Sequence, residues 1–262
     1  MKQRIITAVI AAAVFLPIVI YGGLPFVIFM YLLATVGLYE ALKMKGFSIT
    51  SIPGFLSFLL ILVLLVPSAW IPTDFVFAKV DVLLLIALLL LTYTVISKNK
   101  FTFDDVGFIL ISTVYVGMGF FYFIEIREIS LAYVFFALIV IWTTDSGAYF
   151  IGKSLGRNKL WPEISPNKTV EGSLGGVVCA IVVAVIFQFT VGFEHSLLIT
   201  ILIASILSVV GQIGDLAESA LKRHYQVKDS GKLLPGHGGI LDRFDSLLFV
   251  LPLLHFIHKF LS

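Results

Sequence analysis

Four carboxylates near the end of the chain occur as two pairs, each with a spacing of three residues. Asp215 and Glu218 lie at the end of one apolar run (GQIGDLAESALKR), and Asp242 and Asp245 begin the next (DRFDSLLF). Side chains three residues apart share one face of a helix. Unpaired, the four would repel one another and be costly to remove from water, so they require a positive partner. Oxygen ligands of this kind suit Mg²⁺, which keeps coordination positions for water and phosphate. The pairs therefore predict a magnesium site that also holds a phosphorylated substrate.

Basic side chains beside the two pairs offer an alternative to a metal. Lys222 and Arg243 could neutralise the carboxylates in a salt-bridge network that caps the helices. Charges that are removed from water are retained in proteins when they are paired in this way. The spacing alone leaves both interpretations open.

The segment between the two pairs favours a phosphate ligand. Its PGHGGI turn contains three glycines within four residues, which lets backbone N–H groups approach an anion closely. Four basic residues in or next to the segment could donate hydrogen bonds to phosphate oxygens: Lys222, Arg223, Lys228 and Lys232. A glycine-rich turn is weak evidence by itself, but together with these residues it indicates an anion site.

A second basic segment, residues 152–172, joins two apolar runs. Its Lys153, Arg157 and Lys159 are equally explained by the excess of positive charge that flanks membrane helices on the cytoplasmic side. Lys168 and Glu171, in SPNKTVEG, are less readily explained in that way. Asp145 lies inside the preceding apolar run, and ionisable residues at membrane depth are functional candidates.

The composition indicates what kind of scaffold positions these residues. Apolar residues make up 59% of the 262 residues and charged residues 13%, whereas soluble domains carry about 25% charged residues. A helix needs about 20 apolar residues to cross a hydrocarbon core. Nine runs of suitable length cover residues 5–22, 24–42, 52–70, 75–96, 106–124, 131–151, 173–193, 196–218 and 243–261. The sequence therefore predicts an all-α integral membrane protein with about nine transmembrane helices.

The distribution of basic residues orients these helices. With the N-terminus in the cytoplasm, only three of the 18 Lys and Arg residues fall outside the cytoplasmic side: Lys79, Arg127 and Lys259. Cytoplasmic loops carry such an excess of Lys and Arg. Both polar segments then face the cytoplasm, where nucleotides are. We expect residues 1–130 to be scaffold helices and residues 131–262 to carry the catalytic loops, within one structural unit.

The stretch from Ser219 to Asp245 resembles the signature of the phosphatidate cytidylyltransferases, also called CDP-diacylglycerol synthases. That signature is a Ser, then Lys-Arg, then Lys-Asp, and a His-Gly-Gly loop that ends in Asp-Arg-x-Asp. Its positions are occupied here by Ser219, Lys222, Arg223, Lys228, Asp229, Pro235, His237, Gly238, Gly239, Asp242, Arg243 and Asp245. The stretches TTDSGAYFIGKSLGR and SPNKTVEGSLGG are also similar to that family, whereas over residues 1–130 only hydrophobicity and order agree.

The resemblance implies a reaction and its participants. CTP and phosphatidate would give CDP-diacylglycerol and pyrophosphate with Mg²⁺, in phospholipid biosynthesis at the bacterial inner membrane. A second, monovalent cation such as K⁺ and a homodimer are also implied, and no nucleic acid is expected as a partner.

The resemblance also assigns roles to residues. Asp215 and Asp242 would be the main cation ligands, with Glu218 and Asp245 beside them. Lys222, Arg223 and His237 would act in catalysis. Because a phosphate monoester with a second pKa near 6 is already largely ionised around pH 7, we expect His237 to be a phosphate or loop-orienting donor rather than a base. The expected substrate-binding residues are Asp145, Lys168, Glu171, Ser219, Lys228, Asp229, Gly238, Gly239 and Arg243.

Two other functions fit parts of the sequence. A CTP-dependent lipid kinase is the closest enzymatic alternative, and it differs in that no cytosine label from CTP would enter the lipid. A secondary transporter would also carry carboxylates within its helices, but its site is expected near the membrane midplane with broken helices. The carboxylates here gather toward one surface, beside a basic loop, which favours an enzyme.

Overall fold

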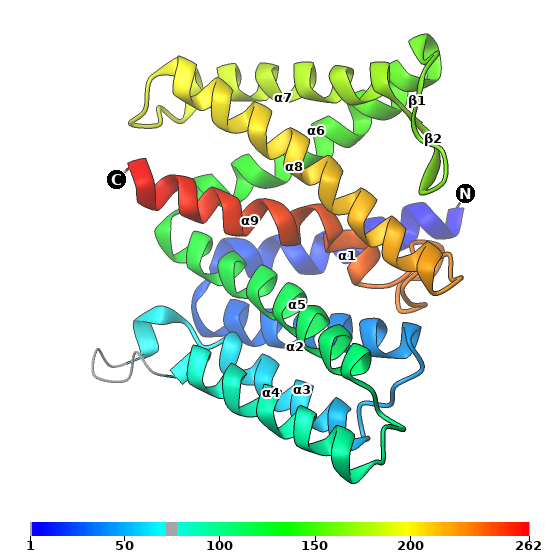
Figure 1. The fold of residues 1–262 in the computed structure, drawn as a ribbon. Coiled ribbons are helices and arrows are strands. Elements are labelled where there is room, and N and C mark those ends of the chain that lie inside the picture. The colour runs from blue at the N-terminus through cyan, green and yellow to red at the C-terminus, as the bar shows by residue number, and fades with distance from the viewer. Residues whose placement is uncertain (1, 72–77, 262) are drawn as a thin grey trace. The chain divides into compact units, whose positions relative to one another are not determined.

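The computed structural model describes residues 2–71 and 78–261, and this part of the chain is almost entirely helical (Figure 1). Its nine α-helices are α1 (Lys2–Tyr21), α2 (Gly23–Met44), α3 (Ile52–Leu64), α4 (Ala78–Ile96), α5 (Phe103–Ile129), α6 (Leu131–Leu155), α7 (Val170–Thr190), α8 (Leu197–His224) and α9 (Leu241–Leu261). A 3₁₀ turn, η1 (Ser68–Trp70), and two short strands, β1 (Lys159–Trp161) and β2 (Ser165–Thr169), complete the described elements. The predicted all-α membrane fold is confirmed.

Each of the nine predicted apolar runs corresponds to one of these helices, and eight of the described helices are long and apolar enough to cross a membrane. The exception is α3, whose 13 residues extend about 20 Å at 1.5 Å per residue. Ser51 caps its start, because Ser51 Oγ accepts a hydrogen bond from Gly54 N at 3.2 Å. Residues 75–77 of the fourth predicted run lie outside the described residues.

The helices gather into two compact units. The first comprises residues 1–125 and 229–241, and the second comprises residues 126–228 and 242–262. The chain therefore passes from one unit to the other three times: within α5, between Lys228 and Asp229 after α8, and at the start of α9. The single structural unit expected from the sequence stays a prediction.

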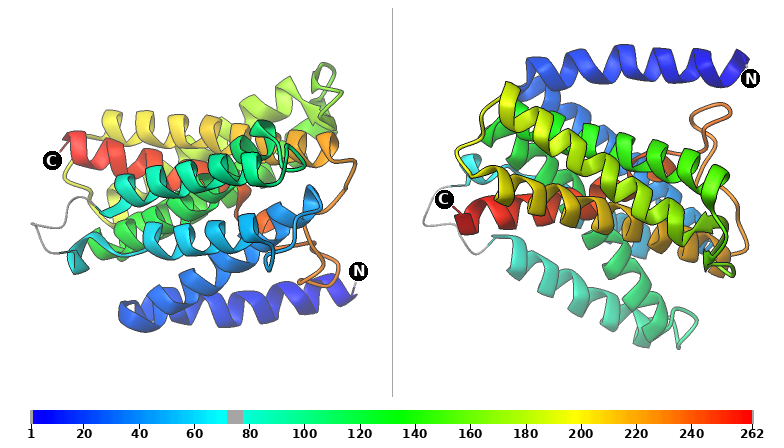
Figure 2. Two further views of the ribbon diagram at one scale, coloured as in Figure 1. Left: turned by 60° about the horizontal axis from the view of Figure 1, so that its bottom comes forward. Right: turned by 90° about the horizontal axis from the view of Figure 1, so that it is seen from above.

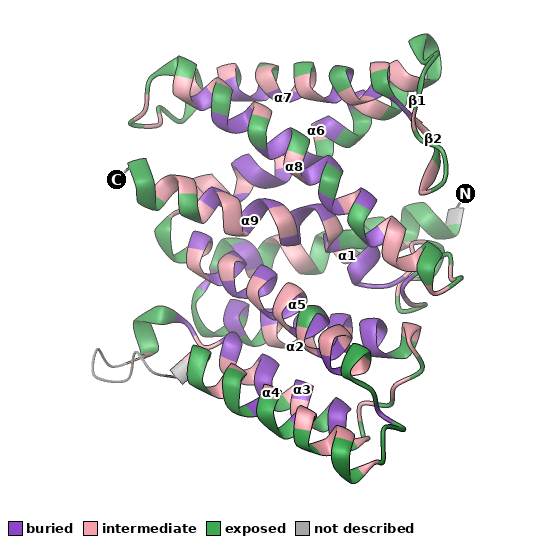
Figure 3. Ribbon diagram, in the orientation of Figure 1, coloured by how far each residue is buried: buried purple, intermediate pink, exposed green. Residues whose placement is uncertain are grey.

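Aromatic packing and an apolar exterior characterise the first unit. The rings of Phe26 in α2 and Phe123 in α5 lie 5.4 Å apart in an edge-on arrangement, and both side chains are buried. Large apolar side chains of α1 and α4 are instead exposed, among them Ile6, Val9 and Leu84. Figure 3 shows this contrast between buried and exposed faces of the helices. Exposed apolar faces of this kind suit contact with lipid.

In the second unit, α7 packs along both α6 and α8, and the views of Figures 1 and 2 agree on this arrangement. The backbones of α6 and α7 are in close contact. A Cβ at Gly172 would lie 2.6 Å from the carbonyl oxygen of Ala148, and one at Gly176 would lie 2.8 Å from that of Thr144. Small residues allow membrane helices to approach in this way.

A short hairpin connects α6 to α7. Strands β1 and β2 are antiparallel, with Lys159 opposite Thr169 and Trp161 opposite Ser165. Thr169 then caps α7, because its Oγ1 accepts a hydrogen bond from Gly172 N at 3.1 Å. The hairpin therefore lies at the end of α6 and the beginning of α7.

Candidate active site

A cavity of about 500 Å³ lies in the second unit, between the hairpin and helices α6, α7 and α8. Its charged and polar lining residues include Asp145, Lys153, Arg157, Lys159, Asn167, Lys168, Gln212 and Asp215. Four of these side chains are basic, so the cavity suits an anionic ligand. Of the expected substrate-binding residues, Asp145 and Lys168 line it.

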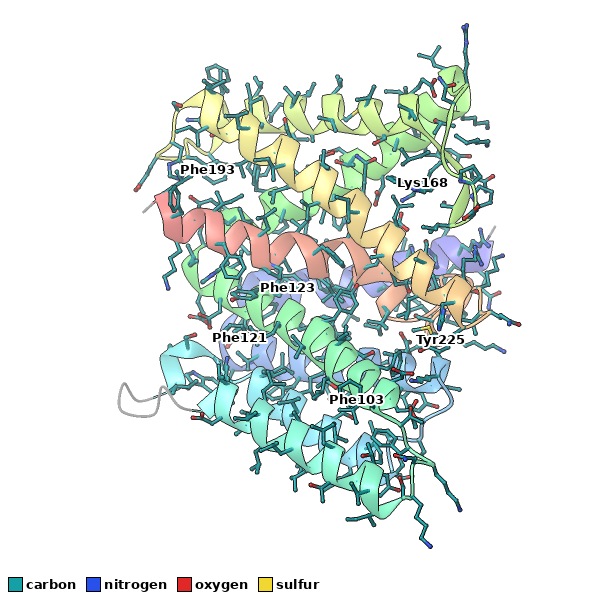
Figure 4. The ribbon with its side chains drawn as sticks, in the orientation of Figure 1. Phe103, Phe121, Phe123, Lys168, Phe193 and Tyr225 are labelled. Atoms are coloured by element: carbon teal, nitrogen blue, oxygen red, sulfur yellow. The ribbon has the colours of Figure 1, made fainter. Side chains whose placement is uncertain are left out.

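Lys168 and Asp215 form an ion pair on the wall of this cavity. Lys168 Nζ lies 2.6 Å from Asp215 Oδ2, and each side chain keeps about 30% of its surface exposed (27% and 31%). Figure 4 labels Lys168 on the hairpin. The contact joins the hairpin to α8, and Ser219 Oγ donates a hydrogen bond to Asp215 Oδ1 at 3.3 Å. The ion pair thus holds the Lys168 amine and the Asp215 carboxylate at the surface of the cavity, next to the space that a bound anion would occupy.

Glu171 shapes this site through the backbone. Its carboxylate accepts hydrogen bonds from Arg157 N at 3.1 Å and Asn158 N at 3.2 Å, and from Asn158 Nδ2 at 2.8 Å. These bonds hold the segment before β1 against the start of α7. Since Arg157 lines the cavity, Glu171 helps to set one side of it without lining it.

A second charge cluster joins α8 to α9. Lys222 pairs with Glu218, one turn earlier in α8, and its Nζ lies 2.6 Å from Asp242 Oδ1 in the first turn of α9. Both carboxylates are buried, and Lys222 is 12% exposed. Asp245 Oδ1 accepts a hydrogen bond from Ser246 N at 2.7 Å. The salt-bridge network considered as an alternative to a metal is therefore present around Lys222, whereas the Arg243 side chain is exposed.

Gly214 lets α8 and α9 approach at this cluster. A Cβ at Gly214 would lie 2.8 Å from the carbonyl oxygen of Asp245 and 3.1 Å from the Phe249 side chain. The two acidic helix segments that the sequence singles out are therefore brought together.

Comparison with known proteins identifies the family. A profile of the cytidylyltransferase family matches residues 2–261. The chain belongs to this family. It is 57% identical to the phosphatidate cytidylyltransferase of Bacillus subtilis (strain 168) over 262 residues, covering 98% of this chain and 97% of that protein.

Two staphylococcal relatives give the same result. The chain is 49% identical to the phosphatidate cytidylyltransferase of Staphylococcus saprophyticus and 46% identical to that of Staphylococcus haemolyticus, each over 260 residues. Both alignments cover 98% of each chain. The family was thus correctly inferred from residues 219–245 and the two upstream stretches.

A magnesium ion shared with a substrate stays a prediction for this chain, in which Asp215 pairs with Lys168 and Asp242 with Lys222. In residues 2–71 and 78–261, no three Asp, Glu, His or Cys side chains form a group that could enclose a metal. Mg²⁺ does not require such a group, because it commonly uses one or two carboxylates and completes its shell with water and phosphate oxygens. Asp215 and Asp242 supply hard oxygen donors, so their assignment as cation ligands stays a prediction that the donor chemistry supports.

The His-Gly-Gly loop of the chain belongs to the first unit. Leu234 N donates to Gly238 O at 2.9 Å, and His237 N donates to Leu234 O at 2.8 Å, which closes a tight turn. Gly238 has a φ of 85°, a conformation that glycine adopts without strain. Arg223, Lys228 and Asp229 have exposed side chains.

One contact of this loop was missed from the sequence. Glu40 in α2 is 3% exposed, and its carboxylate accepts hydrogen bonds from Ile240 N at 2.9 Å, Leu241 N at 3.0 Å and Ser230 Oγ at 3.0 Å. Its segment, LYEALKMKG, resembles an ordinary basic helix end. The available signal was an acidic side chain within an apolar run, the same feature that singles out Asp145.

Proposed function

We propose that the chain transfers the cytidylyl group of CTP to phosphatidate, which gives CDP-diacylglycerol and pyrophosphate. The observation that carries this proposal is the cavity that Lys168 and Asp215 line together with Lys153, Arg157 and Lys159, in a chain of the cytidylyltransferase family. A cavity lined by four basic side chains and by two carboxylates, those of Asp145 and Asp215, suits a nucleoside triphosphate. The long apolar helices around it suit a substrate that keeps its acyl chains in the membrane.

The reaction needs positioning more than proton transfer. A phosphate oxygen of phosphatidate attacks the α-phosphorus of CTP, the new P–O bond forms, and the bond from the α-phosphorus to the bridging oxygen breaks with loss of pyrophosphate. The second pKa of a phosphate monoester is near 6, so the nucleophile is largely ionised around pH 7. The remaining difficulty is to bring two anions together and to stabilise charge on the leaving group, which positioning and electrostatics can do.

The charged side chains divide this task. Lys168, Lys153 and Arg157 line the cavity and can donate to phosphate oxygens. Asp215 and Asp242 are the ligands that we expect for Mg²⁺, which when bound neutralises negative charge on the triphosphate. Lys222 keeps the Asp242 carboxylate paired through its 2.6 Å contact.

The surroundings of the site complete the proposal. The charge bias of the loops supports an N-terminus in the cytoplasm and an active site that opens to the cytoplasm and sideways to lipid. We expect a multi-pass protein of the bacterial inner membrane that acts as a homodimer. A second cation such as K⁺ is expected beside Mg²⁺.

Product analysis tests the reaction. The purified protein is given phosphatidate, Mg²⁺ and CTP labelled either on the cytosine or on the γ-phosphate. Cytosine label should enter the lipid fraction, and γ-label should leave as pyrophosphate. Transfer of the γ-label to lipid without cytosine label would instead identify a CTP-dependent lipid kinase.

A further inference from the structure

Glu40 is a buried carboxylate whose three hydrogen-bond donors lie about 200 residues away in the sequence. Its partners are the backbone N–H groups of Ile240 and Leu241 and the hydroxyl of Ser230. All belong to the first unit. In the part of the chain that the structure describes, Glu40 forms no ion pair with Lys or Arg. Its negative charge is therefore balanced by hydrogen-bond donors.

These donors include the beginning of α9, which starts at Leu241. The first N–H groups of a helix have no partner within the helix, and side-chain oxygens commonly satisfy them. Glu40 provides this cap from a different helix. Its charge also lies at the positive end of the α9 dipole, where a carboxylate is stabilised.

Two glycines of the loop are matched to the Glu40 side chain. A Cβ at Gly231 or at Gly239 would overlap the Glu40 carboxylate, and neither glycine has a positive φ. Space for this carboxylate therefore explains why glycine stands at both positions. Gly239 belongs to the His-Gly-Gly loop, so part of that motif accommodates Glu40 rather than a phosphate.

A contact from α1 holds the same loop at its other end. Thr7 Oγ1 donates a hydrogen bond to Pro235 O at 3.0 Å. The 230–241 loop is thus attached to α1 at its middle and to α2 at both ends, through Ser230 and through Ile240 and Leu241. The attachment to Glu40 is the one nearest to Asp242, because its donors Ile240 and Leu241 directly precede Asp242 in the chain.

We propose that Glu40 is a positioning residue for cytidylyl transfer. By capping α9 it keeps the first helical turn formed, and Asp242 is the second residue of that turn. Loss of the cap unwinds the turn and removes the Asp242 carboxylate from its fixed place, without changing any group that touches a substrate. The inference rests on the proposed function, because it assigns Asp242 a part in that reaction.

The test compares Glu40→Gln with Glu125→Gln. Gln keeps the size of Glu but replaces one acceptor oxygen by an NH₂ group that faces N–H donors. Glu125 is a matched control, because its Oε1 also accepts from the backbone N–H at the start of a helical turn, that of Ser68 at 2.9 Å, in a segment without site residues. The assay is transfer of cytosine label to lipid, with kcat and the KM for CTP measured separately.

We expect Glu40→Gln to lower kcat about tenfold or more. Loss of the cap and a buried donor without a partner each shift the equilibrium between the formed and the unwound first turn of α9 by about that factor. The KM for CTP should change less than about threefold, because the cavity residues are untouched. Hydrogen exchange should increase in residues 230–245, and Glu125→Gln should keep the wild-type kcat. A kcat for Glu40→Gln within about threefold of that of Glu125→Gln would overturn the proposal.

Ser230→Ala provides a milder second variant if Glu40→Gln does not fold. It removes one donor to Glu40 and leaves the carboxylate in place, so kcat should fall several-fold with the same increase in exchange at residues 230–245. An unchanged kcat and unchanged exchange would contradict the proposal. Failure of the proposed function would be recognised separately, because the wild-type protein would then transfer no cytosine label.

Discussion

Lys222 Nζ lies 2.6 Å from Asp242 Oδ1 and thereby connects the last turn of α8 to the first turn of α9. The same amine pairs with Glu218. The Lys222 amine therefore has two carboxylate partners, those of Glu218 and Asp242. Removal of one carboxylate leaves the amine paired with the other, whereas removal of the amine leaves both carboxylates without it.

Replacement of Asp215 or Asp242 by Ala should abolish cytidylyl transfer while the protein stays folded in detergent. After Asp242→Ala, Lys222 is still neutralised by Glu218, so no isolated charge is left. Turnover and the elution profile on size-exclusion chromatography measure the two properties. A folded variant of either kind with more than about a tenth of wild-type activity would remove that residue from the metal site.

Lys222→Met should both inactivate and destabilise the protein. The substitution leaves Glu218 and Asp242, both buried, without their shared partner. Loss of one partner from a buried ion pair costs about 3–5 kcal/mol. Thermal unfolding in detergent should show a lower Tm, whereas Lys43→Met, an exposed lysine in the last turn of α2, should leave Tm unchanged. An equal Tm for both variants would contradict this role of Lys222.

Lys168→Gln should raise the KM for CTP. Lys168 lines the cavity and is held in place by Asp215 at 2.6 Å. A hydrogen bond to a charged group contributes about 1.5–3 kcal/mol, which corresponds to roughly a tenfold to hundredfold change. Initial rates at varied CTP concentration measure the effect, with Lys100→Gln, on an exposed connection, as control. An unchanged KM would exclude Lys168 from CTP binding.

Cysteine labelling tests the orientation of α9. Its 21 residues extend about 31 Å, enough to cross the hydrocarbon core. After removal of the single native cysteine by Cys179→Ala, a cysteine at Lys232 should react only with reagents on the cytoplasmic side, and one at Lys259 only with reagents on the other side. Reaction of both from one side would overturn the orientation.

His237→Gln should lower activity less than about a hundredfold. The backbone N–H of His237 closes the loop turn, and its buried Nδ1 has no hydrogen-bond partner within the described residues. A general base contributes typically 10²–10⁴-fold, and an ionised phosphatidate does not need one. The rate should still rise with pH near the second phosphate pKa, about 6. Loss of that rise together with a fall of about a thousandfold would identify His237 as the base.

The helices were predictable because long apolar runs have few alternatives in a membrane. Their ends were less so. The eighth run was predicted to end at residue 218, but α8 continues through Lys222 and Arg223 to His224, because a helix can extend past the hydrocarbon core into the polar interface. The hairpin was missed because SPNKT and KLW show no clear alternation of apolar and polar residues.

The composition of the candidate site was predictable, and so was Lys222 as a partner of the carboxylates, but the contacts of the site with more distant segments were not. Charged side chains cluster between positions 215 and 245 of an otherwise apolar sequence, and this cluster was enough to predict where the site lies. The pairing of Lys168 with Asp215 and the cap that Glu40 provides for α9 join segments that are 47 and about 200 residues apart. Such contacts depend on tertiary packing, which spacing within one helix does not reveal.

The shortness of α3 creates a hydrophobic mismatch with the bilayer. A helix of about 20 Å is shorter than the roughly 30 Å hydrocarbon core, and a mismatch is relieved when the bilayer thins or when flanking residues reach the interface. In the turn that follows α3, Glu125 satisfies a backbone polar group, because its Oε1 accepts a hydrogen bond from Ser68 N at 2.9 Å. We therefore expect the thickness of the surrounding membrane to influence the conformation near α3, in a protein that is proposed to make a precursor of that membrane's lipids.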